Sequence, residues 1–253
     1  MQARSFPAAQ GWTWLQEGLA LWRRAPLALT ASCITMMMVL MLSMLIPWIG
    51  QFAPPLLLLP LGVGLFMMCN DIKAGRPASP GLLFRGFRLR LREQIVIGSL
   101  RLLSQLLCFW IAGLIVGIDP SAPLISMSDD GKTLSMAPDV VPFMFWGLAL
   151  GLPLEMFFWF SPQLLALGNQ APVKAMFFSM VACWRNRGAI SLCIFLWALC
   201  FGLVPALLMG LIASISPALG SLLSVPLALL SMPMFYTSFH ASACDIFGAD
   251  LRK

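Results

Sequence analysis

The chain alternates between long apolar runs and short segments rich in arginine. Six of the runs have about the 20 residues that a helix needs to cross the roughly 30 Å hydrocarbon core of a bilayer. They occupy residues 27–49, 52–69, 95–118, 140–167, 189–213 and 218–243. The pattern predicts an all-α fold, a polytopic bundle of six transmembrane helices in one membrane domain over residues 1–253. The second run is short and contains Pro54, Pro55 and Pro60, so we expect it to be tilted, kinked or partly re-entrant.

The composition agrees with a membrane protein. The hydrophobic fraction is 60% and the mean hydropathy is +0.88, whereas soluble domains contain about 45–50% apolar residues. The first 26 residues hold three tryptophans and several polar residues but no small-residue cleavage site, so we expect the first run to be an uncleaved anchor. The seven cysteines include no CxxC pair, so neither a disulfide framework nor a zinc knuckle is predicted.

The basic residues lie on one side of the predicted spans. If the N-terminus is cytoplasmic, fourteen of the sixteen Lys and Arg fall in cytoplasmic segments, Lys132 lies outside and Arg101 lies within a span. The positive-inside rule then predicts that both termini are cytoplasmic. The net charge of +6 would also suit nucleic acid, but basic residues that flank apolar spans favour the membrane, and we expect no nucleic-acid partner.

Segments of helical character precede the first, third and fifth runs. In residues 11–24 an apolar face is predicted on the helix, formed by Trp12, Leu15, Leu19 and Trp22. In residues 81–94 an apolar arc opposes three arginines, as in helices that lie in the headgroup plane. In residues 172–187, Lys174 and Arg185 share a face with Phe178 and Val181, so we expect that helix to be buried against the bundle.

These segments predict a unit of interfacial helix, basic turn, outward span and return span that occurs three times, as three hairpins. Asp-Ile follows the return span at residues 71–72 and again at 245–246. The basic residues near the membrane surface are candidates for binding anionic lipid headgroups: Arg23, Arg24, Arg85, Arg88, Arg92, Arg185 and Arg187. The alternative is that they only anchor the topology, together with interfacial tryptophans.

Two ionisable residues lie at membrane depth, where charges are costly and often functional. Arg101 is six residues into the third run, and Glu155 lies in the inner half of the fourth. Because these runs are joined by one outer loop, we predict an Arg101–Glu155 ion pair with a structural role. The one histidine, His240, has Tyr236 and Cys244 one turn away on either side, and we expect a hydrogen-bonded interior histidine rather than a metal ligand.

The sequence gives little support for metal binding or catalysis. Four residues of the first run share a face that would suit Cu(I), although methionine is also an ordinary gap filler: Cys33, Met37, Met41 and Met44. The outer loop contains Asp119, Asp129, Asp130 and Asp139 without the ligand spacing of a calcium loop. No metal or other cofactor is predicted. Hydrolase, zinc-protease and phosphate-loop motifs are absent, and Ser161-Pro162 is more typical of a helix bend than of a nucleophile.

Four segments together resemble an uncharacterised family of Gram-negative bacterial inner-membrane proteins. They are GWTWLQEGLALWRRAP (11–26), AGRPASPGLLFRGF (74–87), FSPQLLALGNQAPVKAMFFSMVACWRN (160–186) and DIFG (245–248). The resemblance covers nearly the whole chain and implies a compact helical protein of the bacterial inner membrane. It implies no substrate, reaction or site.

Three functions remain open on these grounds. The favoured one is a non-enzymatic protein that organises membrane lipids, or partner membrane proteins including copies of itself. The alternative is a transporter or small channel for a hydrophobic or lipid-like substrate, with copper less favoured. A cavity that joins Arg101 and Glu155 would favour transport, and a packed interior would favour the organising role. An enzyme ranks last because no acid and base pair is visible.

Overall fold

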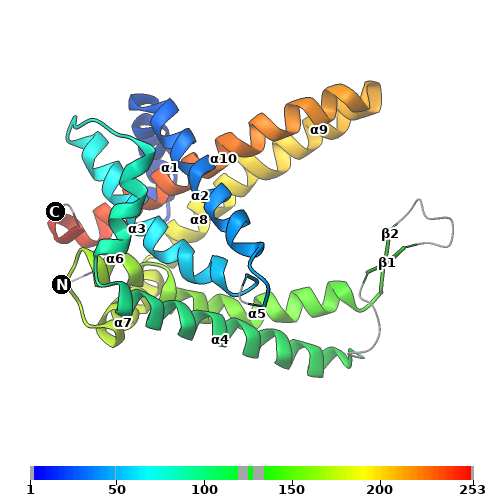
Figure 1. The fold of residues 1–253 in the computed structure, drawn as a ribbon, viewed down its shortest axis with the longest axis horizontal. Coiled ribbons are helices and arrows are strands. Elements are labelled where there is room, and N and C mark those ends of the chain that lie inside the picture. Colours follow the sequence, from blue (N-terminus) through cyan, green and yellow to red (C-terminus); the bar gives the residue numbers. More distant parts are fainter. Residues whose placement is uncertain (1–2, 49, 119–124, 128–133, 252–253) are drawn as a thin grey trace.

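The computed structural model describes residues 3–48, 50–118, 125–127 and 134–251. Most of them are helical, and the elements follow one another as a set of helices with one small hairpin of strands (Figure 1). The first half contains α1 (Gln10–Arg24), α2 (Pro26–Met44), α3 (Ala53–Lys73), the 3-10 helix η1 (Pro80–Arg88) and α4 (Leu91–Val116). The strands β1 (Ile125–Met127) and β2 (Leu134–Met136) pair antiparallel. The second half contains α5 (Val140–Phe158), α6 (Ser161–Ala166), α7 (Pro172–Arg185), α8 (Arg187–Trp197), the π-helix η2 (Ala198–Leu203), α9 (Val204–Ile215), α10 (Pro217–Phe247) and η3 (Gly248–Leu251).

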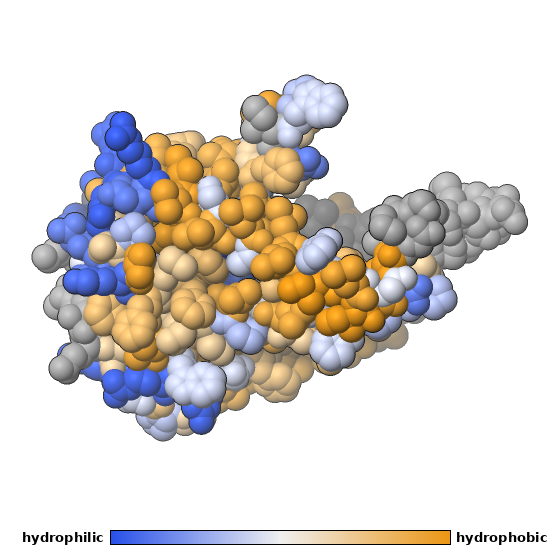
Figure 2. All heavy atoms as spheres, turned by 90° about the horizontal axis from the view of Figure 1, so that it is seen from below, coloured by the Kyte–Doolittle hydropathy of each residue, from blue (hydrophilic) through white to orange (hydrophobic). Residues whose placement is uncertain are grey.

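The helices form a body from which two pairs project. The body holds both termini, and α4 with α5 and α9 with α10 extend away from it side by side (Figure 1). Strongly hydrophilic residues gather at the end that holds the termini, and the rest of the visible surface is largely hydrophobic (Figure 2). This distribution is typical of a protein whose middle and far parts lie in hydrocarbon.

Five stretches of described helix are long and apolar enough to cross a membrane: Pro26–Met44, Ala53–Lys73, Leu91–Val116, Val140–Ala166 and Arg187–Ile215. They overlap the first five predicted runs. The second run was wrongly expected to be short: α3 continues beyond Cys69 to Lys73, and most of it is buried. Pro54 and Pro55 fall in its first turn, where a missing N–H leaves no helical bond unmade. The sixth run, 218–243, lies within the 31 residues of α10.

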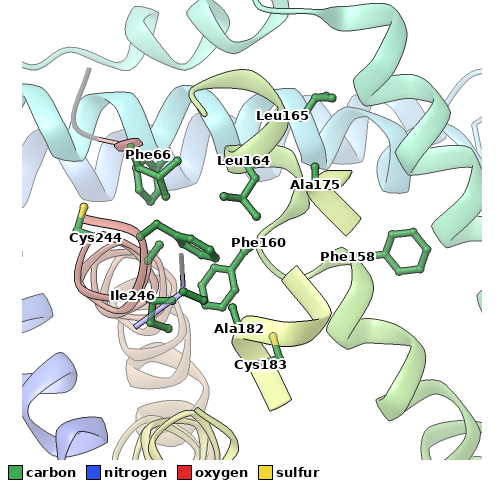
Figure 3. Close-up of a cluster of buried hydrophobic side chains, with 14 of the residues drawn as sticks. Phe66, Phe158, Phe160, Leu164, Leu165, Ala175, Ala182, Cys183, Cys244 and Ile246 are labelled. Carbon is green, nitrogen blue, oxygen red and sulfur yellow. The ribbon is translucent and has the colours of Figure 1, made fainter. Parts of the chain in front are cut away.

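The fourth run is interrupted at the bend predicted for Ser161-Pro162. The helix α5 ends at Phe158, and α6 restarts at Ser161 with proline at its first turn. Phe160, at the interruption, is fully buried and contacts both Phe239 and Phe247 of α10. Around it lie Phe66 of α3, Leu164 of α6, Ala182 of α7 and Ile246 of α10 (Figure 3). The bend therefore places an aromatic ring at the centre of the body.

A second cluster holds α2, α3 and η1 together. Leu29 and Met36 of α2 pack with Leu61 and Leu65 of α3 and with Leu83 of η1. The backbones of α3 and η1 nearly touch, because a Cβ added at Gly64 would collide with the carbonyl oxygen of Leu83. A Cβ added at Gly86 would likewise collide with the carbonyl oxygen of Pro60. Small residues permit such close approach.

The first helix buries a side that the predicted apolar face shares only in part. The buried residues of α1 are Gly11, Trp14, Leu15, Gly18 and Leu21, whereas Trp12 is 48% exposed. Gly11 lies against Ala189 of α8, and Gly18 lies against Ser238 of α10. The two glycines let these helices approach the side of α1 that carries Trp14. The helix α1 therefore packs on the body through this side.

The continuous helix predicted over residues 81–94 is wrong. The 3-10 helix η1 ends at Arg88, Leu89 is extended, and Arg90 has φ 49° in the left-handed region before α4 begins at Leu91. Leu83 is fully buried because η1 packs on α3. The helix α7 forms as expected, but Lys174 and Arg185 are exposed, so the burial predicted for that face is not found.

Candidate functional site

Arg101 and Glu155 form an ion pair between α4 and α5. Arg101 Nη2 lies 3.0 Å from Glu155 Oε2, and Arg101 Nε donates to Glu155 Oε1 over 3.1 Å. Gln105, one turn beyond Arg101, donates to the same Oε1 from Nε2 over 2.6 Å. The two-point contact between guanidinium and carboxylate is the strong geometry for such a pair. The side chains of Arg101 and Glu155 remain 29% and 25% exposed.

The exposed part of this pair faces a cavity of about 170 Å³. Its walls come from α3, α4, α5, α6 and α10 and are mostly apolar and aromatic: Leu58, Leu59, Gly62, Phe158, Trp159, Pro162, Phe235 and Phe239. Its polar lining consists of Arg101, Glu155, Gln163 and Tyr236. Gln163 is only 5% exposed, and its Oε1 has no hydrogen-bond partner among the described residues. Neither Gln105 nor Gln163 was predicted from the sequence as part of a site. The spacing of Gln105 from Arg101, i and i+4 on one helix, could have indicated the first.

A buried polar cluster lies nearer the end that holds the termini. His240 Nε2 is 2.7 Å from Asn70 Oδ1, and since an amide oxygen only accepts, this assigns the proton to Nε2. Asn70 Nδ2 donates to the carbonyl oxygen of Leu251 over 2.8 Å, and Cys244 Sγ lies 3.5 Å from the imidazole. The prediction of a hydrogen-bonded interior histidine is confirmed.

The two Asp-Ile pairs make different contacts. Asp71 bonds to Arg76 Nη2 over 2.6 Å and to Arg85 Nη1 over 2.8 Å. Asp245 accepts hydrogen bonds from Trp14 Nε1 over 2.9 Å and from Gln10 Nε2 over 3.0 Å. Each aspartate therefore joins the end of a long helix to a neighbouring segment.

Comparison with known proteins places the chain in a family. It is 33% identical over 263 aligned positions to a probable inner membrane protein of Burkholderia thailandensis. The alignment covers 98% of this chain and 94% of that protein. The chain belongs to this inner-membrane protein family. The resemblance seen in the sequence is thereby confirmed, and the apolar helices are transmembrane elements of an inner-membrane protein. No protein-family model and no solved structure matches the chain.

In this inner-membrane protein, the arginines predicted to meet lipid headgroups are all exposed. Arg23 and Arg24 form the last turn of α1, and Arg185 and Arg187 flank the break between α7 and α8. The guanidinium of Arg187 lies 5.2 Å from the ring of Trp184, which is itself 61% exposed. An aromatic ring beside an exposed cation is common at the membrane interface.

Two arginines near η1 have contacts that the sequence did not indicate. Arg85 is paired with Asp71 although its side chain is 46% exposed, so part of its charge is already balanced within the protein. Arg90 was not a candidate, yet its Nη1 donates to the carbonyl oxygens of Gln170 and Leu165 over 2.6 and 3.4 Å. These bonds fix the left-handed Arg90 and tie the start of α4 to the loop before α7. Arg88 and Arg92 lie on either side of this junction.

Metal-binding and nucleophilic groups do not gather into a site in the parts of the chain that the structure describes. No group of three or more His, Cys, Asp or Glu side chains there could hold a metal ion. Met41 and Met44 are exposed, on the outer side of α2, while Cys33 is buried. Asp119, Asp129 and Asp130 lie outside the described residues. The Cys183 thiol lies beside the Phe160 cluster (Figure 3), and burial raises its pKa to about 12, so it is protonated at neutral pH.

Proposed function

We propose that this protein is a non-enzymatic, multi-pass inner-membrane protein that organises lipids, holding anionic headgroups at its cytoplasmic end. The observation that carries the proposal is the set of exposed arginines near helix ends at the edges of the body. Each such cation contributes about 1 kcal/mol of attraction to an anionic membrane surface. Exposed aromatic side chains stand close to them in the chain, including Phe84 and Trp184, and such rings settle at the interface.

The proposed topology has six spans and two cytoplasmic termini. The helix α10 supplies the sixth span in addition to the five apolar stretches. The spans then pair as α2 with α3, α4 with α5, and the α8–η2–α9 segment with α10, and the contacts between these partners support that pairing. The concentration of basic residues in the connections on one side supports cytoplasmic termini. Reporter fusions after residue 253 and within the loop 119–139 would test it: a cytoplasmic signal from the loop fusion would contradict it.

The lipid proposal can be tested with reconstituted full-length protein. We expect anionic phosphatidylglycerol to remain bound through purification in preference to phosphatidylcholine. A variant with Arg23, Arg24, Arg88 and Arg92 changed to glutamine should lose about tenfold or more of this preference, because four attractions of about 1 kcal/mol are removed. The matched control changes the same four residues to lysine, which keeps the charge. Equal retention of the two lipids by the unmodified protein would contradict the proposal.

A second function, transport of a lipid-like substrate, is supported by the cavity that Arg101 and Glu155 both line. Most of its lining residues are apolar, which suits a hydrophobic substrate better than a hydrated ion. Its test is movement of a fluorescent lipid between leaflets of proteoliposomes, compared with liposomes that lack the protein. Association with partner membrane proteins or with a second copy would be measured as the mass of the particle in native nanodiscs. No cofactor is part of either proposal.

A further inference from the structure

Two exposed cations line one cavity and are not neutralised by a direct ion pair. Arg24 is the last residue of α1, and Lys73 is the last residue of α3. Both line a cavity of about 260 Å³ between α1, α3 and α10. Within the part of the chain that the structure describes, neither forms a salt bridge. The cavity therefore brings together positive charge from the ends of two helices.

The neighbouring arginines differ in this respect. Asp71 pairs with Arg76 over 2.6 Å and with Arg85 over 2.8 Å. Arg76 lines an adjoining cavity of about 390 Å³ together with Arg24. A paired guanidinium attracts a second anion less strongly, because the carboxylate cancels part of its field. An anionic ligand at this place is therefore attracted chiefly by Arg24 and Lys73.

Both cations mark the same end of the pair of spans α2 and α3. The apolar stretch Pro26–Met44 begins two residues after Arg24, and the stretch Ala53–Lys73 ends at Lys73. Spans begin and end where the hydrocarbon core gives way to the headgroup region, and basic side chains there attract anionic lipids. Arg24 and Lys73 are thus at the depth of the lipid phosphates, which favours a lipid over a soluble ligand.

Glu17 limits the charge of the ligand. Its exposed side chain belongs to the same lining as Arg24 and Lys73, so two basic residues and one acidic residue surround the space. His240 contributes a buried wall, since it is 1% exposed and its Nε2 is bonded to Asn70. Glu17 would repel a second negative charge on the ligand, whereas a ligand hydroxyl can donate to a carboxylate oxygen. A phosphodiester with one charge and nearby hydroxyl groups suits this lining.

We infer that this cavity binds the headgroup of one lipid with a single phosphodiester charge and hydroxyl groups, such as phosphatidylglycerol. The phosphodiester lies between Arg24 and Lys73, and the hydroxyl groups lie on the side of Glu17. The inference rests on the proposed function and deepens it, because it assigns lipid retention to one cavity rather than to exposed arginines in general. It gives Arg23 no part, since Arg23 lines neither of the two cavities.

Native mass spectrometry of the full-length protein in detergent tests the inference with phosphatidylglycerol as the probe. Arg24→Gln and Lys73→Gln should each weaken its binding about tenfold, because a charge-assisted hydrogen bond to the phosphate is lost. Lys73→Arg keeps the charge and should retain binding. The matched controls are Arg23→Gln and Lys174→Gln, which remove the same charges at exposed positions outside the cavity. We expect binding in the controls to change by less than about twofold, because their charges are screened from the site.

Two further probes define the ligand. Phosphatidylmethanol keeps the phosphodiester without the hydroxyl groups and should bind about threefold or more weakly than phosphatidylglycerol; equal binding would overturn the role of Glu17. Displacement of phosphatidylglycerol by an excess of inorganic phosphate would show that the cavity holds free phosphate, and would overturn the lipid assignment. Equal losses in Arg24→Gln and Arg23→Gln would overturn the inference while the proposed function stands. The proposed function itself fails if the unmodified protein binds phosphatidylglycerol and phosphatidylcholine equally.

Discussion

Trp14 Nε1 donates a 2.9 Å hydrogen bond to Asp245 Oδ2 and so joins residues 231 positions apart. The indole is fully buried, and Gln10 Nε2 bonds to the same oxygen over 3.0 Å. The first helix and the end of the last one therefore close the body at a shared carboxylate. The two ends of the family resemblance, the GWTW segment and the DIFG segment, meet at this point.

Replacing Trp14 with phenylalanine should lower the free energy of unfolding by about 2 kcal/mol, because a hydrogen bond to a charged group is lost and the carboxylate keeps only Gln10. The measurement is thermal unfolding of the purified protein in detergent. Trp12→Phe is the matched control, since Trp12 lies two positions away and is 48% exposed. Equal loss of stability in the two variants would show that the bond to Asp245 contributes nothing specific.

The Arg101–Glu155 pair predicts a non-additive response to mutation. Arg101→Ala and Glu155→Ala should each lower stability by about 3 kcal/mol, the low end for breaking a buried pair, because about a quarter of each side chain is exposed. The exchanged variant, Arg101→Glu with Glu155→Arg, should recover part of the loss. Folded yield by size-exclusion chromatography after heating is the readout. An exchanged variant that is less stable than both alanine variants would argue against direct pairing.

The contact between α3 and η1 should tolerate no side chain at Gly64. Gly64→Ala would push η1 away from α3. We expect this overpacking to lower the free energy of unfolding by about 2 kcal/mol or more. Gly81→Ala is the matched control in the same region, because a Cβ there would come no closer than 3.9 Å to Ser79 Oγ. The check is the melting temperature of each variant. Equal melting temperatures of the Gly64→Ala and Gly81→Ala proteins would refute the close approach of α3 and η1.

Asn186 fastens the N-terminal segment to the break between α7 and α8. Its Oδ1 accepts from Phe6 N over 2.9 Å, and its Nδ2 donates to the carbonyl oxygen of Arg4 over 2.9 Å. Asn186→Ala should free this segment and raise the rate of tryptic cleavage after Arg4 about tenfold. The reason is that a loss of roughly 1.4 kcal/mol of stabilisation makes the detached segment about tenfold more populated. Mass spectrometry of timed digests measures the rate.

Ser5→Ala is the control for that digest. It removes an exposed 3.3 Å hydrogen bond to the carbonyl oxygen of Arg185 in the same segment, and we expect the cleavage rate to stay within about twofold, as exposed bonds contribute little. If cleavage after Arg4 is as slow in Asn186→Ala as in the unmodified protein, the amide does not hold the segment.

Much of the helical layout could be predicted because apolar runs of about 20 residues have few alternatives in a bilayer. The bend at Ser161-Pro162 follows from the missing proline N–H, and the proximity of Arg101 to Glu155 follows from two spans that share one loop. The side of each helix that is buried was harder to predict. The buried side of α1 depends on which helices approach Gly11 and Gly18, and tryptophan, with an apolar body and a polar N–H, suits either side.

Tertiary contacts decided the features that the sequence could not reveal. Arg90 adopts a left-handed backbone that glycine would usually supply, and it does so because its guanidinium reaches the carbonyl oxygen of Gln170, 80 positions away. Gln163 gives no signal in the sequence either. Its place in the lining of the cavity beside Arg101 is visible only in the folded protein.

The projecting helix α9 has few partners within the protein. None of the residues in the apolar window of Arg187–Ile215 is buried within the protein, and Leu207, Leu211 and Ile215 of α9 face outward. The surrounding amphiphile is thus the main packing partner of α9. Melting in a micelle reports chiefly on the body that α1, α3 and the end of α10 close, and acyl-chain length is the variable that would act on α9.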